Sequence, residues 1–261
     1  MKRHVTLYSL LLLLLSGVCM TAGASVLSAD SIGYYKMVAD SAYASGDFAT
    51  AEECYSLLAQ QGESEVVYYN LGCTYYRQDE IAKSVLWFER ALRLNPSNED
   101  IRFNLAMARN KTVDRIIPRH EMFFTSLWKS LMRSQSVTRW AYTGISLFAL
   151  TLLLIALYLY SSRVVLRKIG FFGGLVMFLL CLLSNVLALS LRNYNVHNDS
   201  GIIMTPAVTV RSTPTQSGTD LFVIHEGTHV VIRDDSMRDW AEIQIADGKI
   251  GWIEKSTYEK I

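Results

Sequence analysis

Two long apolar stretches stand out in the pattern of hydrophobic and polar positions. Trp140–Tyr160 and Ile169–Leu191 contain no Asp, Glu, Lys or Arg. At about 1.5 Å per residue, each is long enough to cross a ~30 Å hydrocarbon core as a helix. Aromatic residues at their ends, such as Trp140 and Tyr160, suit the headgroup layer. The pattern therefore predicts transmembrane helices at 140–160 and 169–191.

The segment between these stretches, 161–168, carries Arg163, Arg167 and Lys168. Short loops rich in Lys and Arg face the cytoplasm. This predicts a cytoplasmic loop, with both flanking domains on the opposite side. We expect a multi-pass protein of the bacterial inner membrane with its folded domains in the periplasm.

The N-terminus has the pattern of an export signal. Lys2 and Arg3 precede an apolar run over Val5–Val18, which ends near the small residues Ala22 and Ala24. This order is typical of a signal peptide, and we predict one over residues 1–24. Lipid modification at Cys19 and an uncleaved N-terminal anchor are the alternatives.

A repeat with a period close to 34 precedes the membrane, in residues 32–64 and 65–98. In the second copy, small and large residues alternate as two packed antiparallel helices require, and a proline ends the second helix. These positions are Tyr68, Leu71, Gly72, Tyr75, Ser84, Phe88, Ala91 and Pro96. The pattern resembles the tetratricopeptide repeat. Residues 99–111 repeat the first-helix pattern, so we predict an array with a capping helix over 32–111.

The inner face of such an array is a candidate protein-binding groove. Its predicted residues are Tyr43, Tyr69, Tyr76, Arg77, Phe103 and Met107. The set is aromatic and differs from the family's carboxylate clamp, because Asp40 and Asp100 invert the charge at two clamp positions. A groove for an aromatic peptide or helix and a plain scaffold surface both remain open. Arrays this short are marginal alone, so we expect support from another chain or from the membrane surface.

The segment 118–139 joins the repeat to the membrane. A helix there would place apolar side chains on one face, with basic residues at its flank. The apolar positions are Phe123, Phe124, Leu127, Trp128, Leu131 and Met132. Such a helix either lies on the bilayer or packs against the repeat.

Residues 204–261 change to short apolar alternations separated by turn residues. Ala241, Ile243 and Ile245 alternate with polar residues, and Asp247-Gly248 predicts a two-residue hairpin turn. We expect a compact all-β barrel. The order of landmarks resembles the bacterial SH3 domain, which implies a ligand-binding module for cell-wall peptides or proteins. The landmarks are Arg211, Gly227, Trp240, Gly251 and Trp252.

This β region also contains the pattern of a zinc protease, from His225 to His229. That chemistry needs a helix, which alone places both imidazoles and the carboxylate around one metal. Gly227 and the flanking strand patterns argue against a helix. We therefore predict no enzyme activity, no metal and no cofactor.

Composition excludes further classes of protein. The chain has 25 basic and 24 acidic residues, a net charge of +1, and four cysteines among 261 residues. The charge balance argues against nucleic-acid binding, and the few cysteines argue against a disulfide-stapled domain.

The order of these segments resembles the BatE type of the Bacteroides aerotolerance-operon proteins over the full length. The resemblance implies an envelope complex with von Willebrand A-type membrane proteins and a MoxR-type ATPase. The predicted fold class is a multidomain membrane protein with a helical array, a two-helix transmembrane hairpin and an SH3-like barrel. We predict a non-enzymatic adaptor that brings partners together. A peptidoglycan-binding cell-wall sensor is the alternative.

Overall fold

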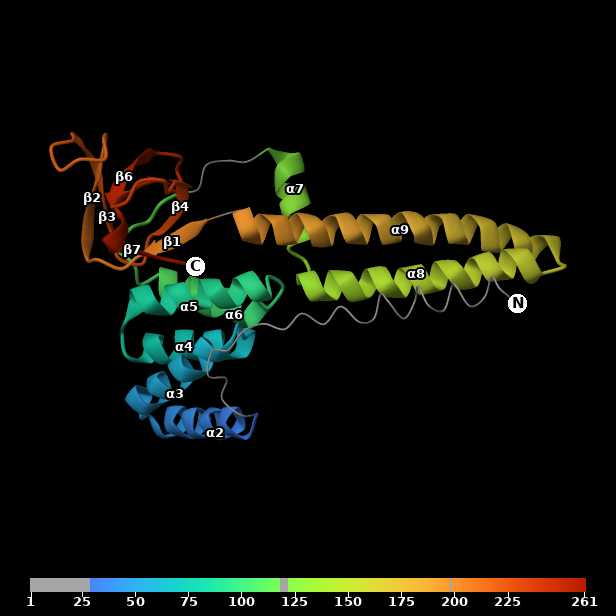
Figure 1. The fold of residues 1–261 in the computed structure, drawn as a ribbon, viewed down its shortest axis with the longest axis horizontal. Coiled ribbons are helices and arrows are strands. Elements are labelled where there is room, and N and C mark those ends of the chain that lie inside the picture. The colour runs from blue at the N-terminus through green and yellow to red at the C-terminus, as the bar shows by residue number, and fades with distance from the viewer. Residues whose placement is uncertain (1–28, 118–121, 198) are drawn as a thin grey trace, which may run out of the picture.

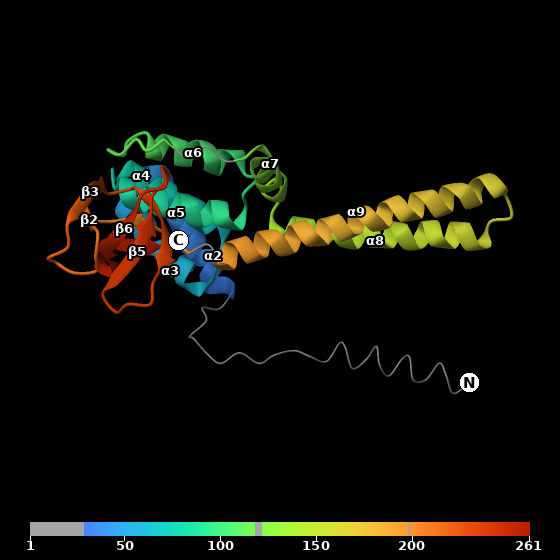
Figure 2. The ribbon, with the colours of Figure 1, turned by 90° about the horizontal axis from the view of Figure 1, so that it is seen from above.

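The computed structural model describes residues 29–117, 122–197 and 199–261. A helical array and a β-sheet pack together, and a helical hairpin projects from them (Figures 1 and 2). We call the array and the sheet together the head. This architecture confirms the predicted fold class. The predicted signal peptide, 1–24, lies outside the described residues.

Five consecutive helices form the array, as the repeat predicted. They are α2 (Ala29–Ser45), α3 (Phe48–Gln61), α4 (Glu65–Arg77), α5 (Ile81–Leu94) and α6 (Glu99–Arg109). Asp47, Ser64 and Asn98 cap α3, α4 and α6, each accepting a hydrogen bond from a backbone N–H of the first turn. Polar caps between amphipathic stretches thus fix the helix starts locally.

Close packing within the second repeat depends on Gly72. A Cβ at this position would lie 2.5 Å from Cδ1 of the buried Phe88 ring. The Ser84 hydroxyl donates to the carbonyl oxygen of Gly72 at 2.8 Å, which ties α5 to α4. The small residues therefore let α4 and α5 approach closely, and the large side chains fill the space between the two helices.

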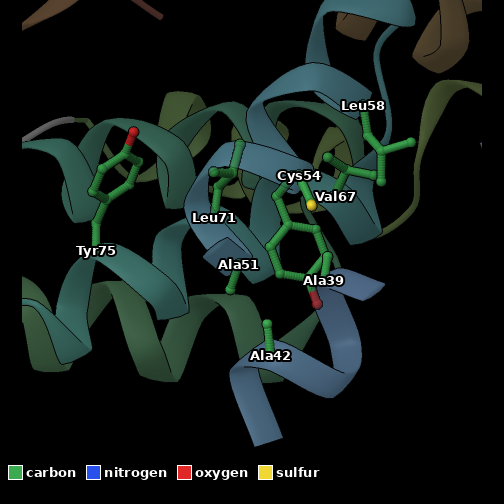
Figure 3. Packing of buried hydrophobic residues seen from close by; sticks show 9 residues of the cluster. Ala39, Ala42, Ala51, Cys54, Leu58, Val67, Leu71 and Tyr75 are labelled. Carbon is green, nitrogen blue, oxygen red and sulfur yellow. The ribbon is translucent and has the colours of Figure 1, made fainter. Parts of the chain in front are cut away.

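The first repeat uses alanines for the same purpose. Ala39, Ala51 and Leu71 are fully buried between α2, α3 and α4 (Figure 3). Ala39 stands where the repeat pattern has its small residue. A degenerate first copy is therefore still well packed.

The hairpin consists of α8 (Val137–Tyr160) and α9 (Val164–His197), which pack along their length (Figure 1). Both are long and apolar enough to cross a membrane. Large apolar side chains such as Leu153, Leu159 and Phe172 point away from the protein. A helix from a soluble core would bury such residues, so this exposure favours a lipid environment.

The helix ends differ from the predicted spans. Only residues 161–163 connect α8 to α9, because Arg167 and Lys168 already lie in the first turns of α9. The predicted loop 161–168 is therefore largely helical. Apolarity marks only the part of a helix inside lipid, whereas backbone hydrogen bonds continue into the interface.

A short helix, α7 (Phe123–Met132), crosses the head-side end of α9 (Figure 1). Met132 is buried there with Trp140, Leu187 and Leu191. Phe123 and Phe124 are 72% and 80% exposed. The apolar face of α7 is thus left open beside the end of the hairpin.

The C-terminal region forms one antiparallel sheet with strand order β3-β2-β6-β5-β4-β1-β7. The strands are β1 (Ser200–Ile203), β2 (Ala207–Arg211), β3 (Asp220–His225), β4 (His229–Asp234), β5 (Trp240–Gln244), β6 (Ile250–Glu254) and β7 (Tyr258–Lys260). Alternate residues such as Ala241, Ile243 and Ile253 are fully buried, which confirms the predicted period of two.

The β5–β6 turn is one residue longer than predicted. The Ile245 N–H donates to the Lys249 carbonyl, and the Gly248 N–H donates to the Ile245 carbonyl. Gly248 has a φ of 96°, so it supplies the left-handed residue of a three-residue loop. The same Asp-Gly pair suits both turns, which is why the sequence did not separate them.

Candidate protein-binding site

The predicted groove residues lie on three helices of the array. Tyr43 is on α2, Phe103 and Met107 are on α6, and the other three, Tyr69, Tyr76 and Arg77, are on α4. The Asn104 side chain donates to the Tyr69 hydroxyl at 3.0 Å, which joins α4 to α6 on this face. We call the surface of these first helices the inner face.

Tyr43 and Arg77 meet over a third residue, Phe48. The Tyr43 and Phe48 rings pack edge to face at 5.5 Å, and the Arg77 guanidinium lies 4.8 Å from the Phe48 ring centre. Arg77 stays exposed. Its charge therefore sits on an aromatic base at the end of the inner face.

Tyr76 is less accessible to a binding partner than the sequence predicted. The Lys111 ammonium lies 4.5 Å from its ring centre and pairs with Asp79 at 2.9 Å. Phe103, in contrast, is 69% exposed, and Met107 is half-buried. The exposed apolar part of the inner face is therefore centred on α6.

The polar groups between α2 and α4 satisfy one another. The Tyr55 hydroxyl donates to the Asp40 carboxylate at 2.6 Å and accepts from the Asn70 amide at 3.1 Å. Burial, followed by the bond to Asp40, raises the pKa of Tyr55. Asp40 also pairs with Lys36 at 2.7 Å. These contacts engage side chains that a carboxylate clamp would need in order to bind its ligand.

Tyr69 and the two cysteines near the groove, Cys54 and Cys73, are uncharged at neutral pH. Burial is the first cause that raises the pKa of Tyr69 to about 12, and the neighbouring Cys73 adds to it. Burial also raises the pKa of the Cys73 thiol and of the Cys54 thiol. Both cysteines are free thiols in the structure. Such a face offers hydrogen bonds and apolar contact rather than nucleophilic chemistry.

The landmarks of the β region divide into those that shape the sheet and those that face outward. A Cβ at Gly251 would lie 2.5 Å from Cγ1 of Val210, so only glycine fits there. Arg211 donates to the Gln216 carbonyl and holds the β2–β3 loop. Trp240 and Trp252 stay half-exposed, opposite in register to Glu254 and Glu242. The two tryptophan side chains are therefore partly open to solvent, on the face of the sheet opposite its buried residues.

The protease-like segment is a strand, a turn and a strand. His225 ends β3, Gly227 takes a φ of 81° in the turn, and His229 begins β4. In the described ranges, no three His, Cys, Asp or Glu side chains gather to hold a metal ion. The helix that this motif needs is therefore replaced by a β-turn.

The His225 segment has a structural partner that the sequence analysis missed. The Asp114 carboxylate accepts hydrogen bonds from the His225 N–H at 2.6 Å, its ring Nδ1 at 2.8 Å and the Thr228 hydroxyl at 2.7 Å. Burial works to raise the pKa of Asp114, but these bonds outweigh it and the pKa is lowered. Asp114 follows α6 in a segment without periodicity, so no pattern pointed to it.

The same segment continues across the sheet. A Cβ at Gly227 would lie 2.5 Å from the Thr112 methyl group, and Ile116 packs against the buried core of the sheet. Residues 112–116 therefore fasten the sheet to the array, although the predicted domain boundary left them unassigned. We call them the strap.

A second contact joins the sheet to α5. Ile202 of β1 is fully buried in one cluster with Val85 and Phe88 of α5. Arg90 donates to the Glu259 carboxylate at 2.9 Å and to the Lys260 carbonyl at 2.6 Å. The sheet thus packs on the α5 side and leaves the inner face uncovered. The support expected from another chain or the membrane comes, in this structure, from the chain's own sheet.

Family comparisons agree with both parts of the head. Residues 206–258 match the bacterial SH3 domain. Residues 66–98 match the tetratricopeptide repeat. The comparison with curated proteins finds no match. The chain therefore carries two kinds of domain that are typically non-catalytic interaction modules, together with two apolar helices that could cross a membrane.

Proposed function

We propose that the protein is a non-enzymatic adaptor anchored in the bacterial cell envelope. It binds protein partners through the inner face of the array and through the SH3-like sheet. The observation that carries this proposal is the docking of the sheet on α5, which leaves Arg77 and Phe103 exposed on the inner face. Phe103 and the half-buried Met107 give this face apolar contact area, and Arg77 adds a charge.

In this proposal both modules lie on one side of the membrane that the hairpin crosses. The chain runs from the array through α7 into α8, and it continues from α9 into β1 of the sheet. Both connections lie at the same end of the hairpin (Figures 1 and 2). Arg163, Arg167 and Lys168 lie at the other end. The preference of basic loops for the cytoplasm then supports a periplasmic head. Because the head is docked rather than loosely tethered, its two binding faces keep a fixed spacing.

The aerotolerance-type complex is the biological setting that the resemblance implies. In that setting the partners would be von Willebrand A-type membrane proteins and a MoxR-type ATPase. Full-length protein purified after cross-linking in intact cells should carry such partners.

Replacing Tyr69 and Tyr76 by Ala tests the inner face. We expect cross-linked partners to be lost while membrane insertion is retained. Tyr34→Ala is the matched control, because Tyr34 is 60% exposed on α2 but outside the groove set. Circular dichroism of both variants separates lost binding from lost folding, since Tyr69 also packs against Phe88. Unchanged partner capture by a folded double variant contradicts the proposal.

Protease added to spheroplasts tests the topology. Both parts of the head should be degraded, while the connection at 161–163 stays protected. Survival of either part places it on the cytoplasmic side and refutes the periplasmic arrangement.

Peptidoglycan binding is the second candidate function. It is supported by the match to the bacterial SH3 domain and by the half-exposed Trp240 and Trp252. Sedimentation with purified sacculi separates the two functions. A pure protein adaptor stays in solution, whereas a cell-wall sensor sediments and loses this property with Trp252→Ala.

A further inference from the structure

A cavity of about 180 Å³ lies where the array, the sheet and the hairpin meet. Arg93 and Arg102 reach it from α5 and α6, and Arg133 reaches it from the end of α7. Tyr194 of α9 and His229 of β4 also contribute polar side chains to its wall. The cavity exists only in the docked structure, because its wall comes from all three parts of the molecule.

The cavity has an excess of positive charge. Glu89, the one Asp or Glu among the lining residues, is paired with Arg109. Arg93 pairs with Glu63 at 3.3 Å and donates to the main-chain oxygen of Ile261 at 2.5 Å, so it is not free for a ligand. Over the ranges that the structure describes, neither Arg102 nor Arg133 has a carboxylate within ion-pairing distance. Two guanidinium groups are therefore left for an external anion.

Arg133 is the more constrained of the two. It is half-buried, donates to the Tyr194 hydroxyl, and lies 4.7 Å from the centre of that ring. Removing a cation from water without a counter-ion is unfavourable. Burial lowers the pKa of His229, so this ring stays neutral at pH 7 and can hydrogen-bond without adding charge.

The position of the cavity indicates the source of the anion. Leu191 and Tyr194 line it from the last turns of α9. Leu191 also packs with Trp140 and with Met132 of α7. Aromatic residues at the ends of membrane helices lie at headgroup depth. The exposed Phe123 and Phe124 of α7 stand at the same end of the hairpin, where acyl chains would meet them.

We propose that this cavity binds the phosphate headgroup of an anionic phospholipid. Arg102 and Arg133 contact the phosphate, and Leu191 borders the glycerol and acyl region. This binding fixes the head against the membrane surface at the joint between the array and the sheet. The proposal rests on membrane insertion of the hairpin, and it does not depend on any protein partner.

Lipid titration of the full-length protein in an uncharged detergent tests the site. Phosphatidylglycerol should raise the melting temperature in a saturable way, and zwitterionic phosphatidylcholine should have a smaller effect. Arg102→Gln should weaken the apparent affinity for phosphatidylglycerol roughly tenfold, because one charge-assisted hydrogen bond is lost. No side-chain bond of Arg102 forms within the described residues, so this variant should fold normally.

A second pair of variants keeps the test decisive. Arg133→Gln should also weaken binding, whereas Arg133→Lys, which retains the charge, should recover part of it. Arg238→Gln is the control, because Arg238 is exposed in the β4–β5 loop and does not line the cavity. All variants are compared by their melting curves without lipid.

Three outcomes overturn the proposal. The first is the absence of stabilisation by phosphatidylglycerol, and the second is equal affinity in the Arg102→Gln and Arg238→Gln variants. The third is equal stabilisation by inorganic phosphate alone, which would assign the cavity to a free anion. No partner protein is present in this assay, so failure of the adaptor function would leave its result unchanged.

Discussion

The two sides of the helical array differ in whether their side chains contact another part of the same chain. On the α5 side, Ile202 is fully buried and Arg90 binds Glu259 and the Lys260 carbonyl. On the inner face, Phe103 is 69% exposed and Arg77 is open to solvent. Both sides carry aromatic and basic residues. Only the structure shows that one side is buried against the sheet while the other stays exposed to solvent.

This difference also explains how a short array can be stable. Neighbouring repeats usually cover each other's apolar edges. Here the sheet covers the edge of α5, and the strap packs against the sheet between the array and the helical hairpin. The two modules therefore form one head rather than two tethered units.

Ile202→Ala should have the largest effect, because it removes buried atoms from the centre of the α5 contact. We expect the free energy of unfolding to fall by about 2–5 kcal/mol. Urea unfolding of the full chain in detergent, followed by tryptophan fluorescence, measures it. Ile250→Ala is the control, since Ile250 is 41% exposed and its loss should cost at most about 0.5 kcal/mol. Equal losses for both variants would refute the proposed role of the contact.

Asp114→Asn should come next, because the charged carboxylate accepts three hydrogen bonds from the sheet. We expect a loss of about 1.5–3 kcal/mol at neutral pH. Asp30→Asn, on the exposed start of α2, is the matched control and should unfold like the wild type.

The pH dependence of this loss follows from the lowered pKa of Asp114. Its contribution is fully present above the unfolded value of 3.8 and disappears as the pH falls through the lower folded value. The stability difference between wild type and Asp114→Asn should therefore shrink only below pH 3.8. A difference that is constant through that window would show that the charge is not what stabilises the strap.

Phe103→Ala should have the smallest effect on stability and a clear effect on binding. Because the ring is 69% exposed, we expect a change in unfolding free energy within about 0.5 kcal/mol. Partner capture should fall roughly tenfold, as for a typical aromatic contact at an interface. Quantitative co-purification after cross-linking measures this change. Val66→Ala is the control, because Val66 is 52% exposed on α4 outside the groove set.

Much of the fold could be predicted because its signals are local. Periodicity gave the five array helices and the alternating strands, and the small residues Gly72 and Ser84 indicated which helices pack closely. The ends of the two hairpin helices were predicted less accurately, since apolarity marks the part of a helix suited to lipid and not the end of its backbone hydrogen bonds. The repeat pattern also predicted that the groove residues lie on the first helix of each repeat and on the capping helix. It did not predict that Lys111, which follows α6, lies over the Tyr76 ring.

The sequence alone determined which elements form and which of their faces are apolar, because both depend on neighbours a few residues apart. It could not determine that Asp114 binds His225 and Thr228, or that Ile202 packs on α5. Those contacts join positions more than a hundred residues apart, and their energy depends on geometry that no local pattern encodes. The tertiary structure therefore decided which faces were closed, which stayed open and where three arginines met.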